Sequence, residues 1–181
     1  MTVQIGAKTH DFSDPTGLLS DCHRRIEMFL GSLQQVAKVI DSPLTEEARS
    51  ALEAALRYFH EAAPKHTKDE EDSLFPRLRE IHHPELERAL SALDALEDDH
   101  RHADALHAEV HTLGAQCLES GHLPPAVANR FRQAVHDLAS IYGQHIRIED
   151  TVVFPAAQRV LSCTQKAAIA TEMASRRHVV A

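Results

Sequence analysis

The sequence predicts an all-α fold, an up-down-up-down four-helix bundle with a short extra helix at the C-terminus. Apolar residues recur at helical spacing in four long segments. Short loops marked by proline separate these segments, and short loops place consecutive helices antiparallel to one another. The composition also favours helices over sheets, because only 4% of the residues are aromatic, no Trp occurs and only 6 of 181 are Gly.

The first two helices are bounded by capping residues and prolines. Residues 13–15 (Ser-Asp-Pro) begin the first helix, because a capping side chain there precedes a proline that fits the first turn. Residues 41–43 (Asp-Ser-Pro) end it, and residues 45–47 (Thr-Glu-Glu) open the second helix, which runs toward Leu78. Pro64 lies inside this second segment and is expected to kink or interrupt it, because proline cannot donate a backbone hydrogen bond.

The remaining helices follow in the same way. Residues 82–84 (His-His-Pro) mark a boundary, and a third helix is expected from Pro84 to Leu118. Pro124-Pro125 opens the fourth helix, which is expected to continue through Pro155 to Leu161. A last short helix over residues 164–177 is expected to pack outside the bundle.

The length and charge limit the domain organisation and the partners. A chain of 181 residues can form one domain with its own hydrophobic core. We expect residues 1–13 to form an N-terminal extension, 14–161 the bundle, and 162–181 the C-terminal helix and tail. The net charge of −8 argues against a nucleic-acid partner, which would need a basic face.

The cysteines and the apolar runs indicate the compartment. Cys22, Cys117 and Cys163 lie far apart and include no Cys-x-x-Cys pair. This pattern fits neither a disulfide framework nor a thiolate zinc site, and it indicates a reducing compartment. The N-terminus lacks a signal-peptide core, and no apolar run approaches the length that spans a membrane. We therefore expect a cytoplasmic protein with no membrane partner.

An internal repeat organises the histidines, of which the chain has 14. Residues 66–76 read His-Thr-Lys-Asp-Glu-Glu-Asp-Ser-Leu-Phe-Pro, and residues 145–155 read His-Ile-Arg-Ile-Glu-Asp-Thr-Val-Val-Phe-Pro. Both place Glu four residues after His, then a second acid, and both end in Phe-Pro. Each half also has a His-Arg pair on the helix before, at residues 23–24 and 100–101. A shared pattern of this length predicts that the two halves serve one site.

The spacing within the repeat suits metal binding. Residues four apart lie on one face of a helix, so the His and the Glu of each repeat can reach the same ion. If the halves fold about a pseudo-two-fold axis, the two carboxylates can bridge two ions while the imidazoles complete their coordination. Mixed imidazole and carboxylate ligands suit iron, with manganese and zinc as alternatives. The predicted ligands are His23, His66, Glu70, His100, His145 and Glu149.

These elements resemble the hemerythrin-like HHE cation-binding domain of bacteria. The resemblance covers residues 14–160 and is strongest over residues 65–76. It implies a four-helix bundle that holds two iron ions, bridged by carboxylates and an oxo or hydroxo group, and that reacts with dioxygen, nitric oxide or peroxide. It further implies that the four histidines are terminal ligands and that the two glutamates are the bridging carboxylates.

Other polar residues near the predicted ligands stay open as alternatives. Asp150 has the His-x-x-x-x-Asp spacing of oxygen-carrying hemerythrins, so it competes with Glu149 for the bridge, although the repeat favours Glu149. Those carriers have a fifth His on the third helix where this chain has Asp104, which argues against reversible oxygen carriage. Further alternative ligands, or residues that orient a ligand, are Glu71, His60, Glu27, Asp104 and Tyr142.

We therefore expect a non-haem di-iron protein that binds or reacts with dioxygen, nitric oxide or peroxide, in the handling of oxygen, iron or nitrosative stress. We expect a metal- and small-ligand-binding protein rather than a dedicated enzyme. Two alternatives stay open: a metal-dependent sensing module that acts through a partner protein without turnover, and an enzyme that consumes peroxide or nitric oxide.

Overall fold

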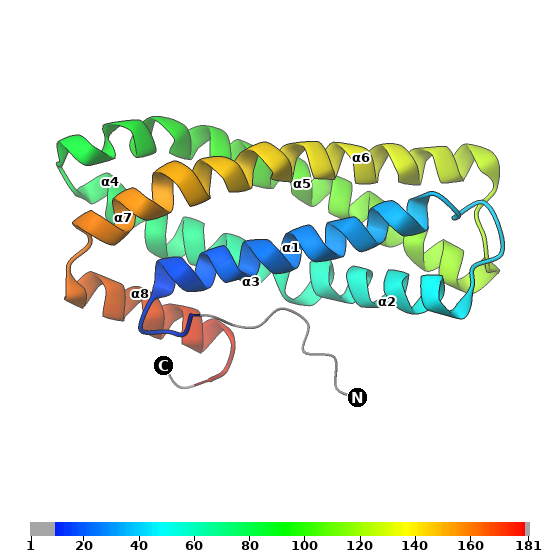
Figure 1. Cartoon of the computed structure of the whole chain (residues 1–181), viewed down its shortest axis with the longest axis horizontal. Coiled ribbons are helices and arrows are strands. Elements are labelled where there is room, and N and C mark those ends of the chain that lie inside the picture. Colours follow the sequence, from blue (N-terminus) through cyan, green and yellow to red (C-terminus); the bar gives the residue numbers. More distant parts are fainter. Residues whose placement is uncertain (1–9, 180–181) are drawn as a thin grey trace. The chain divides into compact units, whose positions relative to one another are not determined.

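The computed structural model describes residues 10–179, so most of the predicted N-terminal extension lies outside the described residues. All regular structure within the described range is helical, and no strand occurs there (Figure 1). The prediction of an all-α bundle is therefore confirmed. None of the described helices is both long and apolar enough to cross a membrane.

The helices follow the predicted order, and the second, third and fourth predicted segments are each interrupted. Pro64 was expected to break the second helix, and α2 ends two residues before α3 begins. A short 3-10 turn precedes the third helix, and wider turns interrupt the second and fourth segments before their Phe-Pro pairs. The elements are α1 (Pro15–Ala37), α2 (Glu46–Glu61), α3 (Ala63–Lys68), η1 (Asp69–Leu74), α4 (Phe75–Glu80), η2 (Pro84–Leu86), α5 (Glu87–Ser120), α6 (Pro125–Ile148), η3 (Glu149–Val153), α7 (Phe154–Val160) and α8 (Cys163–Arg176).

The wider turns η1 and η3 are π-helical. The backbone N–H of Phe75 donates to the carbonyl of Glu70, five residues back, and the N–H of Phe154 donates in the same way to Glu149. Each phenylalanine is followed by a proline, which has no N–H and whose ring would collide with the carbonyl four residues earlier. The wider turn accommodates the proline without ending the helix. The repeated Phe-Pro therefore explains why both wide turns begin at or beside a predicted ligand.

The described residues form two compact units. Unit 1 contains residues 10–25, 64–98 and 145–179, and unit 2 contains residues 26–63 and 99–144. Helices α1, α5 and α6 contribute residues to both units. The predicted division of the chain at residues 13 and 161 stays a prediction.

A single hydrophobic core joins the helical segments of unit 1. Leu19 of α1, Phe75 of α4, Leu93 of α5 and Phe154 of α7 all belong to it, so four segments distant in sequence share one interior. Burying large apolar side chains of this kind is the main stabilising contribution to the unit.

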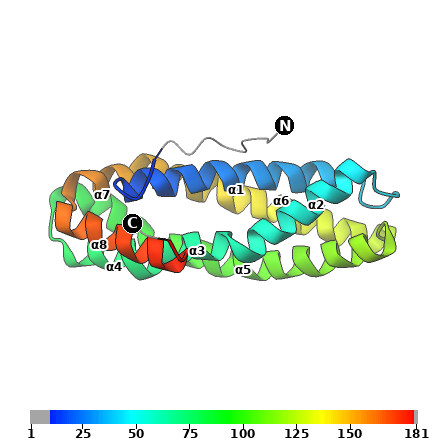
Figure 2. The ribbon, with the colours of Figure 1, turned by 90° about the horizontal axis from the view of Figure 1, so that it is seen from below.

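Helix α8 belongs to this core as well. Ile169 and Met173 are fully buried in it, and α8 lies against η1, the turn between α3 and α4 (Figure 2). The C-terminal helix was expected to pack outside the bundle. In the structure α8 packs against η1, which belongs to the second predicted helical segment. Its start is fixed by Ser162, whose hydroxyl accepts from the N–H of Gln165 while the Gln165 side chain accepts from the N–H of Ser162.

Replacing Ser162 with Ala should lower the free energy of unfolding by about 1 kcal/mol, because the first turn of α8 loses its cap. Urea denaturation followed by circular dichroism measures the change. Ser175→Ala, at an exposed position near the end of the same helix, is the matched control. Equal stability of the Ser162 variant and the wild type would contradict this role of the cap.

Candidate metal centre

The structure brings five of the six predicted ligands together inside unit 1. His23 comes from α1, His66 from α3, Glu70 from η1, His145 from α6 and Glu149 from η3. All five side chains are buried, and both glutamates are completely inaccessible to solvent. A cluster of imidazoles and carboxylates is therefore enclosed in the hydrophobic interior.

The repeat spacing produces the same contact in each half. His66 Nε2 lies 3.1 Å from Glu70 Oε1, and His145 Nε2 lies 3.0 Å from Glu149 Oε2. These pairs are four residues apart on their helices, as the sequence pattern requires. His23 joins the halves, because its Nε2 lies 3.1 Å from Glu149 Oε2 and 3.8 Å from Glu70 Oε1.

The distances suit metal ligation. One ligand atom from each of four residues can be chosen so that all lie within 4.8 Å of one another, and these residues are His23, His66, Glu70 and Glu149. Glu70, His145 and Glu149 satisfy the same limit. Both glutamates thus belong to two ligand groups, so each could bridge two ions. The chain therefore provides a buried metal-binding cluster.

Three buried polar atoms of this cluster lack a hydrogen bond of ordinary geometry. His23 Nε2 and both carboxylate oxygens of Glu149 are buried and make no such bond among the described residues. Their mutual contact has the distance of an ion pair but lacks hydrogen-bond alignment. Buried polar atoms of this kind are costly unless something satisfies them. Metal ions would do so, and a donor set of imidazole nitrogens and carboxylate oxygens fits iron.

Burial and charge shift the pKa values of the cluster. Burial raises the pKa of Glu70 well above its usual range, and the negative charge of Glu149 adds to the effect. Burial would also raise the pKa of Glu149, but His145 and His23 hold it well below its usual range. Burial would lower the pKa of His23, yet its hydrogen bond to Asp150 and the charges of the two glutamates raise it to about 10.

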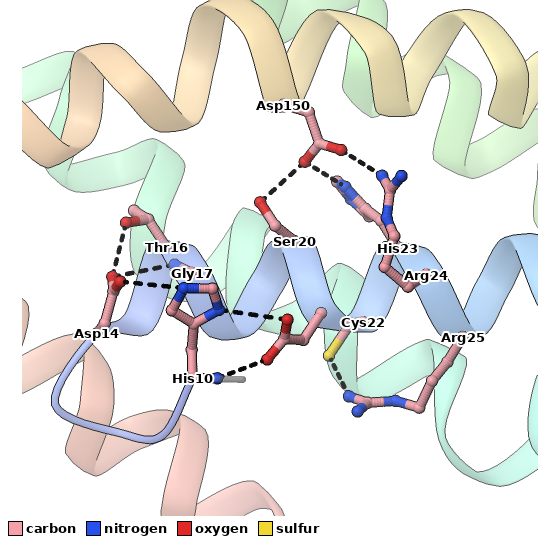
Figure 3. A network of polar contacts seen from close by, with 11 residues as sticks. His10, Asp14, Thr16, Gly17, Ser20, Cys22, His23, Arg24, Arg25 and Asp150 are labelled. Carbon is pink, nitrogen blue, oxygen red and sulfur yellow. Dashed lines mark hydrogen bonds and ion pairs between the residues drawn. The ribbon is translucent and has the colours of Figure 1, made fainter. Parts of the chain in front are cut away.

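Asp150 contacts His23 on the Nδ1 side of its ring (Figure 3) and belongs to neither ligand group. Its carboxylate accepts from His23 Nδ1 at 2.9 Å and from the Ser20 hydroxyl at 2.9 Å, and it also forms an ion pair with Arg24. Because the Asp150 carboxylate binds Nδ1, the other ring nitrogen, Nε2, faces the glutamates. Proteins commonly orient metal-binding histidines by such a carboxylate contact. Of the two candidate bridging acids, Glu149 thus faces the cluster and Asp150 orients an imidazole.

Asp69 is a buried carboxylate beside the cluster that the sequence analysis did not single out. Arg176 Nη1 donates to Asp69 Oδ1 at 2.9 Å, and Arg177 Nη2 donates to Asp69 Oδ2 at 2.6 Å. Arg176 also donates to the Ser73 hydroxyl at 2.8 Å. These contacts tie the end of α8 to the turn that carries Glu70. In the sequence, Asp69 differs only in being an acid where the other half of the repeat has the apolar Ile148.

Of the remaining predicted residues, Glu71 belongs to unit 1 and the others to unit 2. His100 belongs to unit 2, where it is buried on α5. Glu71 is partly buried, and Glu27, His60 and Asp104 are exposed. The His60 ring lies 5.2 Å from the ring of His111, measured between centroids. Tyr142 is buried in unit 2, with its hydroxyl 3.0 Å from His107 Nε2.

Most of the chain is similar to known proteins. Residues 14–157 match the hemerythrin HHE cation-binding domain family. A protein of Haemophilus influenzae, described as uncharacterized, is 26% identical over 174 residues, which cover 93% of this chain and 92% of the relative.

Replacing Asp69 with Ala should lower the free energy of unfolding of the metal-free protein by about 2 kcal/mol, because Arg176 and Arg177 lose the carboxylate they share. This loss is smaller than for a fully buried ion pair, since both guanidinium groups are partly exposed to solvent. Urea denaturation measures the change. Asp72→Ala is the control, because the Asp72 side chain is 59% exposed. Similar losses in the two variants would refute the assigned role of Asp69.

The metal-free protein should become less stable as the pH rises above neutrality. A group whose pKa is higher in the folded chain than in the unfolded chain stabilises the fold. Its full contribution is present at a pH below the unfolded-state pKa, and it is lost as the pH rises through the folded-state pKa. For His23 this window runs from 6.5 to about 10. The raised pKa of Glu70 acts in the same direction. Urea midpoints between about pH 7 and 9 should fall in the wild type and stay flatter in His23→Gln. Midpoints that rise over this range would contradict the assignment.

Proposed function

Because this chain belongs to the hemerythrin HHE cation-binding domain family, we propose that it is a non-haem di-iron protein that binds or reacts with dioxygen, nitric oxide or peroxide. The observation that carries the proposal is the buried group formed by His23, His66, Glu70 and Glu149. A completely buried pair of carboxylates among imidazoles has little structural value by itself, and it suits two metal ions.

In this proposal the two glutamates are shared and the histidines divide between two ions. His23 and His66 hold the first ion. His145 and His100 hold the second ion. In the repeat, His100 corresponds to His23. The burial of His100, and the His-Arg pair that it shares with His23 in the repeat, support this assignment.

Four imidazoles and two shared carboxylates leave coordination positions free for a small molecule. Two iron ions, when bound, can supply electrons for the reduction of dioxygen or peroxide. The protein surrounds this site with apolar side chains such as Leu74, Val153 and Phe154, all of which are buried. The Phe154 ring stacks on His23 with 5.2 Å between the ring centroids. These groups exclude bulk water and restrict the site to small ligands.

We further propose a cytoplasmic location, in the handling of oxygen, iron or nitrosative stress. Three free cysteines support a reducing compartment, since Cys22 and Cys117 are buried as thiols and Cys163 is exposed. The proposed partner is the small molecule itself, with neither nucleic acid nor membrane.

Protein loaded with iron under anaerobic conditions should contain about two iron ions per chain. His66→Ala and Glu149→Gln should each lose most of this iron, because each removes a ligand that no neighbour replaces. Metal analysis by mass spectrometry measures the content, and His60→Ala, at an exposed position before α3, is the control. Full iron in the two ligand variants, or zinc in place of iron after expression with both metals, would refute the proposal.

Visible spectra of the same iron-loaded samples identify the small molecule. A stable new band on addition of dioxygen or nitric oxide, without turnover, indicates a binding protein. Rapid loss of added peroxide or nitric oxide indicates an enzyme instead. No spectral change with any of the three contradicts a reaction at open coordination positions.

A further inference from the structure

Unit 2 contains a pair of titratable side chains, the buried Tyr142 and the partly buried His107, that the proposed metal site does not use. The Tyr142 hydroxyl lies 3.0 Å from Nε2 of His107, and Tyr142 is only 8% exposed. The Phe59 ring stacks on the His107 imidazole with 4.5 Å between the centroids. A phenol and an imidazole are thus held together in an apolar setting.

His107 is available to accept a proton. Burial lowers the pKa of His107 to about 4, so its imidazole is uncharged at neutral pH. An uncharged imidazole has one nitrogen with a free lone pair. When that nitrogen is Nε2, the Tyr142 hydroxyl donates to it and its proton has a short path to a base.

The phenol also lies close along its helix to a proposed metal ligand. Tyr142 precedes His145 by three residues within the continuous helix α6. This separation corresponds to a rise of about 4.5 Å and places both side chains on one face of the helix. Side chains three residues apart are neighbours on the surface of a helix, so an electron can pass between them without an intermediate carrier.

The composition narrows the possible electron donors. The chain has no Trp and only two tyrosines, Tyr58 and Tyr142. The Tyr58 ring stacks on Phe29, with 4.3 Å between the centroids. Of the two phenols, Tyr142 combines a hydrogen bond to an uncharged histidine with a position one helical turn from a ligand.

We propose that Tyr142 is a one-electron donor to the metal centre and that His107 accepts the proton it releases. This inference rests on the proposed iron site. Tyr142 gives one electron to the oxidant that hydrogen peroxide and reduced iron generate together, and its O–H bond breaks as the proton moves to His107 Nε2. The products are a neutral tyrosyl radical, an imidazolium and an oxidant reduced by one electron. A small-molecule thiol can later return a hydrogen atom to the phenoxyl oxygen, so that its S–H bond breaks and a thiyl radical leaves the site, after which His107 releases its proton to solvent.

Such a reaction would protect the site. An oxidant that is not reduced at once attacks nearby imidazoles or thiols, and Cys22 lies next to His23 in the sequence. A phenol that gives up an electron and later recovers it removes this oxidising equivalent without covalent damage. Tyr142 would thus act as a one-electron donor that is reduced again after each reaction.

The first experiment adds hydrogen peroxide to the iron-loaded protein, freezes it within a second and records the electron paramagnetic resonance spectrum. We expect a tyrosyl radical in the wild type and in the control Tyr58→Phe, and its loss in Tyr142→Phe. His107→Phe should also lose the signal, because the phenol then has no base. A radical that persists in Tyr142→Phe but disappears in Tyr58→Phe overturns the proposal, as does no radical in wild type that reacts visibly with peroxide.

The second experiment separates this inference from the iron proposal. Metal-free protein is treated with hexachloroiridate(IV), a soluble one-electron oxidant, and the site of oxidation is located by peptide mass spectrometry after trapping with a nitroxide. We expect the label on Tyr142 in wild-type protein and its loss from that position in His107→Phe. Circular dichroism shows that each variant is folded. Equal labelling of Tyr142 with and without His107 overturns the role of the histidine even if the protein binds no iron.

Discussion

The burial of Glu70 and Glu149 among imidazoles is the constraint on which the rest of unit 1 depends. Both carboxylates are completely removed from water, and an isolated buried charge is among the most costly features a protein interior can contain. The neighbouring histidines compensate only in part, as the opposite pKa shifts of the two glutamates show. A site of this kind needs surrounding groups that hold the charged side chains in place, and it needs cations to balance them.

Two separate polar networks provide that support. Asp150, Ser20 and Arg24 hold the imidazole of His23 from behind, while Asp69, Arg176 and Arg177 hold the turn that carries Glu70 (Figure 3 shows the first). Both networks use an acid next to a proposed bridging glutamate, but on opposite sides of it in the sequence. Charged groups at the edge of the core thus keep the ligands oriented, and the apolar core excludes water. The metal site and the stability of unit 1 therefore depend on the same residues.

The sequence predicted the helices and the cluster well, because both follow from local spacing. His-x-x-x-Glu on a helix determines which side chains share a face, and the repeat indicates that the two faces meet. It was harder to predict from the sequence whether Glu149 or Asp150 faces the cluster. Adjacent side chains point in directions that differ by a rotation about the helix axis, and the π-helical turn η3 changes the size of that rotation. The contacts of Asp69 join residues more than a hundred positions apart, and no local pattern reports them. The hydrogen bond of Tyr142 to His107 likewise joins two helices, so no local pattern in the sequence indicates it.

The π-helical turns have a consequence for the ancestry of the protein. A π turn arises when one residue is inserted into an α-helix, and such insertions are rare because each one disturbs the packing downstream. Here η1 and η3 occupy equivalent places in the two halves, each ending just before Phe-Pro. If the halves descend from one duplicated helical hairpin, that hairpin already carried the insertion. Asp69 and Ile148, which differ at the same place in the repeat, then record divergence after the duplication: one copy has the carboxylate that pairs with the end of α8, and the other has an apolar residue.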